Sequence, residues 1–364
     1  MISMYFIMVE RIKYIDAYRG LAVILMVQQH LQNWLWHKQW LSYGVTFPQH
    51  PFMLSLNFLG NFPAAMFLIS AGIGSAILYD SRIAGLVVFK RGMFILFCGY
   101  LLNLISPHWF KPGSWYILHT IGIALMLSPL LNKIRTAGLI LMFSLFIITP
   151  AFIQTWLNTP LLLGNDYMND ISMKGGVARL IFAEGHFPII PWTGFFVIGI
   201  ICQRMIENDK KYRILLISIL LISAGLLLRW FYTYGFFFAT GGFFFRLFVF
   251  VPYVYPPLPS LIMFVGGVSI LLLFLFLIFD KYKMDFTISI FSFVGRLSLS
   301  WFFIHIIVFN EISALIGIRK TFSASETLII IFLTIIIMLI LSFLWDRKKC
   351  KFSLEWFMRK VVKL

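Results

Sequence analysis

The stretch YIDAYRGLAVILMVQQHLQNWLW, residues 14–36, combines a long apolar run with charged and titratable side chains. A helix needs about 20 mostly apolar residues to cross a bilayer, so we predict a membrane span at about 15–36. Arg19 and His30 lie eleven residues apart in it. At 100° and 1.5 Å per residue, both side chains project from one helix face, roughly 16 Å apart along the axis. Such a face is costly in lipid and indicates a polar interior or a site.

The composition of the whole chain agrees with a protein that lies in lipid. Of its 364 residues, 60% are hydrophobic and only 12% are charged, and the mean hydropathy is +0.91. Soluble domains carry about 25% charged residues. So little polar surface excludes a water-soluble enzyme, a disordered chain and a nucleic-acid-binding domain.

Runs of apolar residues separated by Pro, Gly, Asn or charge predict the architecture. We expect an all-α polytopic membrane protein with about ten transmembrane helices and both termini in the cytoplasm. A single transmembrane domain would cover 1–345, and a basic cytoplasmic tail would cover 346–364. The predicted spans are approximately 15–36, 55–79, 84–105, 115–131, 136–157, 187–206, 212–232, 257–279, 288–309 and 327–345.

The basic residues support this orientation. The predicted inner segments hold 20 Lys and Arg, the outer segments hold 8, and the remaining two, Arg19 and Arg296, lie inside spans. This asymmetry follows the positive-inside rule. The formal charge of +16 is therefore mainly a topology signal and needs no nucleic acid or other acidic partner. The basic run at 347–351 can also bind anionic lipid.

Negative findings narrow the chemistry further. The three cysteines form neither a disulfide framework nor a zinc spacing. We find no Walker motif, no HExxH, no Gly-x-Ser-x-Gly and no paired His/Cys spacing. We therefore expect no metal site.

The predicted topology places all seven histidines on the outer side of the membrane or in the outer halves of the spans. All seven lie in outer connections, at outer helix ends or in outer halves of spans, and histidine is the usual general base near neutral pH. Any acid–base chemistry is therefore expected on the outer side of the bilayer midplane. The seven are His30, His37, His50, His108, His119, His186 and His305.

Each candidate in the first span also has a structural interpretation. Arg19 can be a snorkelling anchor paired with Asp16 one turn earlier, and His30 can be a hydrogen-bonded interior histidine. In the ninth span, Arg296 and His305 are nine residues apart, which places them about 180° from each other on the helix. On that expectation they cannot share one surface, and His305 alone is a candidate.

One further candidate lies outside the spans. His186 belongs to the long outer connection 158–186, where Glu184 can orient a histidine as carboxylates commonly do. The alternative is that His186 and His305 are ordinary structural histidines.

Several segments in order along the chain resemble one family. They are YIDAYRGLAVILMVQQH (14–30), FPAAMFLISAGIGSAI (62–77), ILHTIGIALMLSPLL (117–131), HFPIIPWTGFFVIGI (186–200), YPPLPSL (255–261) and VGRLSLSWFFIH (294–305). Together they resemble the heparan-alpha-glucosaminide N-acetyltransferase-like branch of the transmembrane acyltransferase superfamily, over roughly 10–310. Asp16 and Arg19-Gly20 match its Asp-x-x-Arg-Gly motif. The chain departs from that branch at His30, where Asn is frequent.

The resemblance implies transfer of an acyl group, in particular acetyl, from cytoplasmic acyl-coenzyme A to a sugar or other hydroxyl or amine acceptor on the outer side. We expect His30 to act as the general base, with His305, His186 and Glu184 as further catalytic candidates. Arg19 is expected to bind coenzyme A, with Asp16 and Arg296 as further candidates on the donor side. The membrane would be a prokaryotic cell membrane. The partners would be the bilayer and a glycan or small-molecule acceptor, and a homodimer is possible.

The same polar face is compatible with a second class of protein. A secondary transporter or flippase would use the intramembrane Arg and His residues as a substrate or proton pathway. Substrate flux that does not depend on coenzyme A would favour this alternative. A non-enzymatic scaffold fits poorly with polar groups buried at such a cost.

Overall fold

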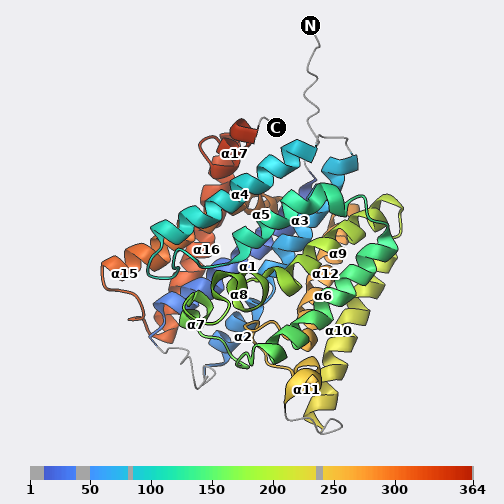
Figure 1. Cartoon of the computed structure of the whole chain (residues 1–364). Helices are drawn as coiled ribbons and strands as arrows, with labels where there is room; N and C mark the ends of the chain where they lie inside the picture. The colour runs from blue at the N-terminus through green and yellow to red at the C-terminus, as the bar shows by residue number, and fades with distance from the viewer. Residues whose placement is uncertain (1–11, 38–49, 81–84, 235–240, 363–364) are drawn as a thin grey trace.

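The computed structural model describes residues 12–37, 50–80, 85–234 and 241–362, and within these ranges it has helices and no strand (Figure 1). Residues 1–11 of the predicted domain and 363–364 of the predicted tail lie outside the described residues. The helices, in chain order, are α1 (Lys13–Leu35), α2 (Pro51–Leu59), α3 (Pro63–Asp80), α4 (Gly85–Ile105), α5 (Ile117–Leu131), α6 (Thr136–Trp156), α7 (Asn165–Asn169), α8 (Gly176–Arg179), η1 (Leu180–Glu184), α9 (Ile189–Glu207), α10 (Lys211–Thr233), α11 (Gly242–Phe248), α12 (Pro259–Lys281), α13 (Asp285–Gly295), α14 (Ser298–Ile306), η2 (Ile307–Ile312), α15 (Ser313–Leu315), α16 (Ala324–Arg347) and α17 (Leu354–Val362).

This architecture confirms the all-α polytopic class. Among the described residues, eight helical segments are long and apolar enough to cross a membrane. Of the other two predicted spans, α1 carries Lys13, Asp16 and Arg19, and α5 is only 15 residues long. The eight segments are Pro51–Asp80, Gly85–Ile105, Thr136–Trp156, Ile189–Glu207, Lys211–Thr233, Pro259–Lys281, Ser298–Leu315 and Ala324–Arg347.

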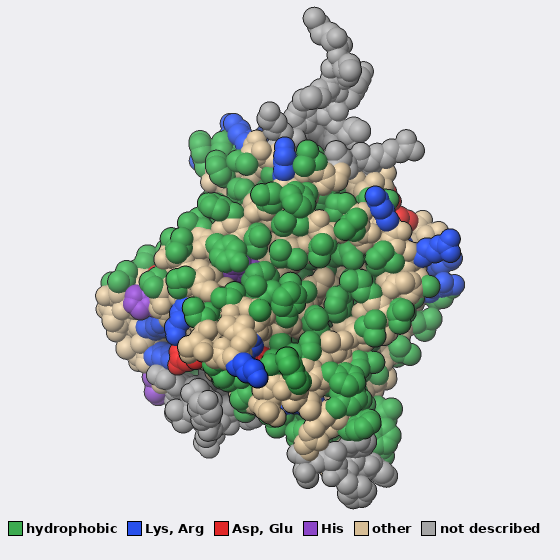
Figure 2. Space-filling model, viewed as in Figure 1, with side chains coloured by type: hydrophobic (Ala, Val, Ile, Leu, Met, Phe, Trp, Pro, Cys, Tyr) green, Lys and Arg blue, Asp and Glu red, His purple; other side chains and the backbone are tan. Residues whose placement is uncertain are grey.

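Burial separates the helices into a central and a peripheral group. The helices α1, α3 and α9 contribute most of the largest fully buried side chains, and α12 adds smaller buried residues to the core. The helices α4, α6, α10 and α16 expose many apolar residues. Figure 2 shows apolar side chains across the middle of the viewed face, with charged side chains mostly near its edges. Exposed apolar surface of this extent suits contact with lipid tails and not with water.

The predicted ninth span, 288–309, is broken. The helix α13 ends at Gly295, and α14 begins at Ser298 after a short non-helical junction. The expectation that Arg296 and His305 cannot face one surface is therefore wrong, because it assumed one continuous helix. Both residues contact α1: Arg296 Nε lies 3.8 Å from Asp16, and His305 hydrogen-bonds His30.

Glycines let the central helices approach closely. A Cβ atom on Gly20 of α1 would lie 1.9 Å from the carbonyl oxygen of Phe291 in α13, and one on Gly295 would lie 1.8 Å from that of Asp16. A similar contact joins α3 and α9, where a Cβ on Gly72 would lie 2.1 Å from the Phe196 carbonyl oxygen. Small residues at such crossings allow the backbone contact that holds membrane helices together.

A pair of glycines in α3 tests this packing. We expect Gly72→Ala to lower stability by about 1–3 kcal/mol, the usual cost of overpacking. Gly74→Ala is the matched control, because a Cβ there meets no atom within 4 Å. Alanine is favoured over glycine in a helix by up to about 1 kcal/mol, so the control should be neutral or stabilising. Thermal unfolding in detergent measures both, and equal melting temperatures for the two variants would contradict the proposed close contact.

Candidate functional site

A cavity of about 330 Å³ lies between the start of α1 and helices α3, α4, α5, α14 and α17. It is at the end of the molecule where α1 begins and α17 packs, which is the predicted cytoplasmic end. Four arginines and two carboxylates supply its charged lining, so cations are in excess. They are Arg19, Arg91, Arg296 and Arg359, with Asp16 and Glu355.

The charged side chains of this cavity are joined by ion pairs. Asp16 accepts from Arg19 Nη1 at 3.4 Å and lies 3.8 Å from Arg296 Nε. Arg296 also pairs with Asp346 of α16 at 2.7 Å, and Arg19 Nε donates to the Ser70 hydroxyl at 3.3 Å. Asp16 therefore hydrogen-bonds Arg19 and lies beside Arg296, which Asp346 holds through the shorter contact. The predicted donor-side residues Asp16, Arg19 and Arg296 do come together.

The other end of α1 carries a pair of imidazoles. His30 Nδ1 lies 2.8 Å from His305 Nε2, although the two residues are 275 positions apart in the chain. The indole of Trp34, one turn after His30, lies 4.9 Å from the His30 ring and 5.7 Å from the His305 ring between centroids. His305 is 1% exposed, whereas His30 is only partly buried.

The partners of the pair fix which nitrogen carries each proton. His305 Nδ1 lies 2.8 Å from the backbone oxygen of Trp301, which can only accept, so this nitrogen donates. In a neutral pair, His305 Nε2 must then accept from His30 Nδ1–H. The lone pair of His30 Nε2 is left over. His30 is thus oriented with one basic nitrogen available, which is the arrangement a general base requires.

Because α1 is one helix from Lys13 to Leu35, the cavity and the imidazole pair are connected by a single rigid element. The eleven residues from Arg19 to His30 correspond to roughly 16 Å of rise, as the sequence predicts. The two polar ends predicted for the first span are therefore both lined by residues of other helices and are not turned to lipid.

The predicted role of Glu184 in orienting a histidine is not supported by its contacts. Within the described ranges its carboxylate, which is fully buried, accepts from Arg179, Thr159 and Tyr167. Arg179 also lies over the Tyr167 ring, 4.9 Å from its centroid. The guanidinium five residues earlier neutralises Glu184, so the carboxylate stabilises the outer connection instead.

His186 lies in the same outer connection and has different partners from the imidazole pair. Its Nε2 donates to the Asn165 side-chain oxygen at 2.9 Å, and its backbone N–H donates to the Trp115 carbonyl at 3.0 Å. His186 is 4% exposed, and burial lowers the pKa of its imidazole to about 3. It makes no hydrogen bond with His30, whose imidazole partner is His305.

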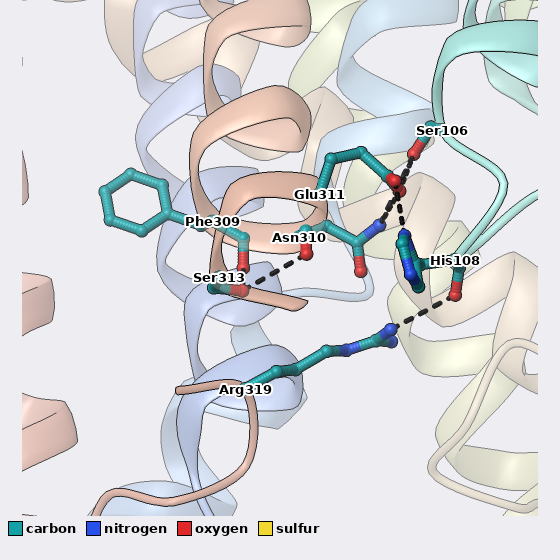
Figure 3. A network of polar contacts seen from close by, with 7 residues as sticks. All are labelled: Ser106, His108, Phe309, Asn310, Glu311, Ser313 and Arg319. Atoms are coloured by element: carbon teal, nitrogen blue, oxygen red, sulfur yellow. Dashed lines mark hydrogen bonds and ion pairs between the residues drawn. The ribbon is translucent and has the colours of Figure 1, made fainter. Parts of the chain in front are cut away.

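A buried carboxylate that sequence reasoning missed lies just beyond the imidazole pair. Glu311, in the π-helical turn η2, accepts from Ser106 at 2.7 Å, from Asn310 at 2.5 Å and from His108 Nδ1 at 2.6 Å. Figure 3 shows Asn310 and Glu311 pointing toward the segment with Ser106 and His108. Arg319 donates to the His108 backbone oxygen at 3.1 Å. This network ties η2 to the connection between α4 and α5.

Sequence reasoning also missed residues at the cavity. Arg91, Arg359 and Glu355 line it from α4 and α17. A signal was available for Glu355, because it is the only carboxylate in the basic segment 347–364. Among the described residues, no group of three His, Cys, Asp or Glu side chains is placed to hold a metal ion.

The fold defines an integral membrane protein, and two polar centres lie at the two ends of its helix α1. The family model described as "Heparan-alpha-glucosaminide N-acetyltransferase, catalytic" matches residues 11–215, more than half of the chain. The chain therefore belongs to this family, and membership indicates transmembrane acetyltransferase activity. The match includes Asp16, Arg19, His30, Glu184 and His186, whereas Arg296 and His305 lie beyond it. No curated protein matches the chain.

The buried His186 predicts a pH dependence of stability. Its folded pKa of about 3 lies below the unfolded value of about 6.5, so between these values the unfolded chain binds the proton and the folded chain does not. Stability is therefore lost as pH falls through this window, at up to about 1.4 kcal/mol per pH unit. We expect His186→Gln to melt with a shallower acid dependence than the wild type.

His37→Gln is the control for this experiment, since His37 is exposed. Thermal unfolding in detergent from pH 7 downward compares the three proteins. An unchanged acid slope in His186→Gln would contradict a neutral, buried His186.

Proposed function

We propose that the protein transfers an acetyl group from acetyl-coenzyme A, bound at the predicted cytoplasmic end, to a hydroxyl or amine acceptor on the outer side. His30 is the general base. The observation that carries this proposal is that α1 alone supplies both Arg19 in the basic cavity and His30 in the imidazole pair. The acceptor is a sugar or another small molecule, and the membrane is a prokaryotic cell membrane.

The chemistry of the cavity supports a polyanionic donor. Coenzyme A carries several phosphate charges, and arginine binds phosphate through forked, charge-assisted hydrogen bonds. Four arginines line the cavity, and carboxylates hold two of them, since Arg19 donates to Asp16 and Arg296 donates to Asp346. Its many apolar lining residues suit the uncharged arm that connects the phosphates to the thioester. In this proposal Arg19 holds the donor, with Asp16 and Arg296 as its supports.

The imidazole pair supports the proton transfers. His30 Nε2 takes the proton from the acceptor hydroxyl or amine while the acceptor oxygen or nitrogen attacks the thioester carbonyl. The carbon–sulfur bond then breaks, and His30 returns the proton to the leaving thiolate. His305 Nε2 accepts from His30 Nδ1–H throughout and stabilises the transient imidazolium. His305 is therefore the orienting partner of the base, held in turn by the Trp301 carbonyl.

A donor-binding experiment tests the cavity. Acetyl-coenzyme A and coenzyme A should raise the melting temperature of the purified protein, because a ligand bound only by the folded state stabilises it. Arg19→Gln should weaken binding roughly 10-fold to 100-fold, since a hydrogen bond to a charged group contributes about 1.5–3 kcal/mol. The control is Arg213→Gln, which removes the same charge from an exposed residue of α10. Equal affinities in wild type and Arg19→Gln would reject this role.

An activity experiment tests the base. His30→Ala should lower the rate of acetyl transfer by about 10²–10⁴-fold, the usual contribution of general base catalysis. Its melting shift with acetyl-coenzyme A should persist, because His30 does not line the donor cavity. His37→Ala, at an exposed histidine beyond the same helix, should keep wild-type activity.

Full activity in His30→Ala would exclude His30 as the base. Reconstituted protein that moves a substrate across vesicles without coenzyme A would instead favour the transporter or flippase alternative for the same Arg and His face.

A further inference from the structure

The C-terminal helix α17 contacts the helix that carries His305 mainly through the Glu355 carboxylate, and the Leu354 backbone N–H also donates to the Ser300 hydroxyl at 3.0 Å. Glu355 Oε1 accepts from the backbone N–H groups of Leu299 at 2.6 Å and Ser300 at 3.1 Å, and Oε2 accepts from the Ser300 hydroxyl at 2.7 Å. Glu355 is 9% exposed. These N–H groups belong to the first turn of α14, and the N–H groups of a first helical turn have no acceptor within their own helix.

The sequence of α14 does not provide this cap itself. Its N-cap residue is Leu297, whose side chain makes no capping hydrogen bond. Glu355 supplies the missing acceptor from 56 positions further along the chain. A carboxylate at this place is also favoured by the positive end of the helix dipole. The start of α14 therefore depends on α17.

The helix α14 is a short rod between the two polar centres. It has 9 residues and is separated from α13 by the junction at 296–297. Ser298 and Leu299 at its start line the cavity, whereas His305 near its end contacts His30. A displacement of the start along or around the helix axis is transmitted to His305, because a helix turns 100° and rises 1.5 Å per residue.

The far end of this rod is held separately. After α14 the chain continues into η2, where Glu311 accepts from Ser106 and His108 (Figure 3). Glu311 therefore fixes the rod on the outer side, and Glu355 fixes it at the cavity. Between these two attachments the His305–His30 hydrogen bond has to be kept at 2.8 Å.

We propose that Glu355 is a positioning residue for acetyl transfer: by capping α14, it holds His305 in hydrogen-bond contact with His30. This inference rests on the proposed function and extends the machinery beyond the family match, which ends at residue 215. Glu355 acts through His305 and takes no part in the proton transfers.

Glu355 also lines the cavity, so a purely electrostatic effect on the donor is the competing explanation. A carboxylate there would repel the phosphates of coenzyme A. On that explanation its removal tightens donor binding and leaves turnover intact. The two explanations therefore predict opposite patterns in kcat and in the KM for acetyl-coenzyme A.

The first experiment compares Glu355→Gln with Glu326→Gln in the full-length protein. Glu326 caps α16 through Ser323 and is exposed, so it controls for the loss of a capping carboxylate at a helix without a site histidine. We expect Glu355→Gln to lower kcat at least 10-fold with the KM for acetyl-coenzyme A changed less than about threefold, and Glu326→Gln to leave both unchanged. Glu355→Asp, which keeps the charge, should recover part of the lost kcat.

The second experiment is a double-mutant cycle with His305→Ala. If Glu355 acts through His305, Glu355→Gln should lower kcat less than about twofold in the His305→Ala background. Multiplicative losses, or a lower KM with unchanged kcat, would overturn the inference. The melting shift with acetyl-coenzyme A is measured for each variant, and a shift that is retained shows that the variant is folded. A wild-type protein that transfers no acetyl group would reject the proposed function itself, an outcome distinct from multiplicative losses.

Discussion

The close backbone contact between α1 and α13 sets the position of the other polar groups. Gly20 and Gly295 have no side chains, so the two helices meet at a distance that no larger residue permits. This contact brings Asp16 beside Arg296 at the predicted cytoplasmic end. It also directs the chain after α13 so that α14 runs along the second half of α1, where His30 and His305 meet. This one glycine contact therefore contributes to the geometry of both polar centres.

Buried charge is the second constraint on the design. An unpaired ion in a membrane interior is expensive, and each buried carboxylate in the described part of the chain has compensating donors. Glu184 is paired with a guanidinium, whereas Glu311 and Glu355 are held by hydrogen-bond donors from other elements. In each case the carboxylate joins segments that lie apart in the sequence or fold. The cost of burial is thus offset by contacts that also fix the geometry of the site.

The sequence was sufficient for the membrane class and for the polar face of α1, because span length and helical periodicity are local properties. The same holds for the family, whose motifs lie in consecutive segments. The junction at 296–297 could not be predicted, since VGRLSLSW contains no proline to interrupt a helix and Glu355, which caps α14 after the break, belongs to a distant helix. The predicted angle of about 180° between Arg296 and His305 was wrong because the break between α13 and α14 was not foreseen. The ion pair of Glu184 could have been predicted from the sequence, since Arg179 lies only five residues before it.

The polarity of α1 has a consequence for membrane insertion. Arg and Asp oppose the insertion of an isolated span, at a cost that reaches about 2.5–3.5 kcal/mol per residue at the centre, and α1 carries both near its start. Arg19 of α1 itself pairs with Asp16, but the second partner of Asp16, Arg296 in the junction, and the partner of His30, His305 of α14, lie more than 270 residues later in the chain. When α1 is synthesised, neither Arg296 nor His305 exists yet. We therefore expect α1 to be a weak signal for its own insertion and to reach its final depth only after the later helices have entered the bilayer.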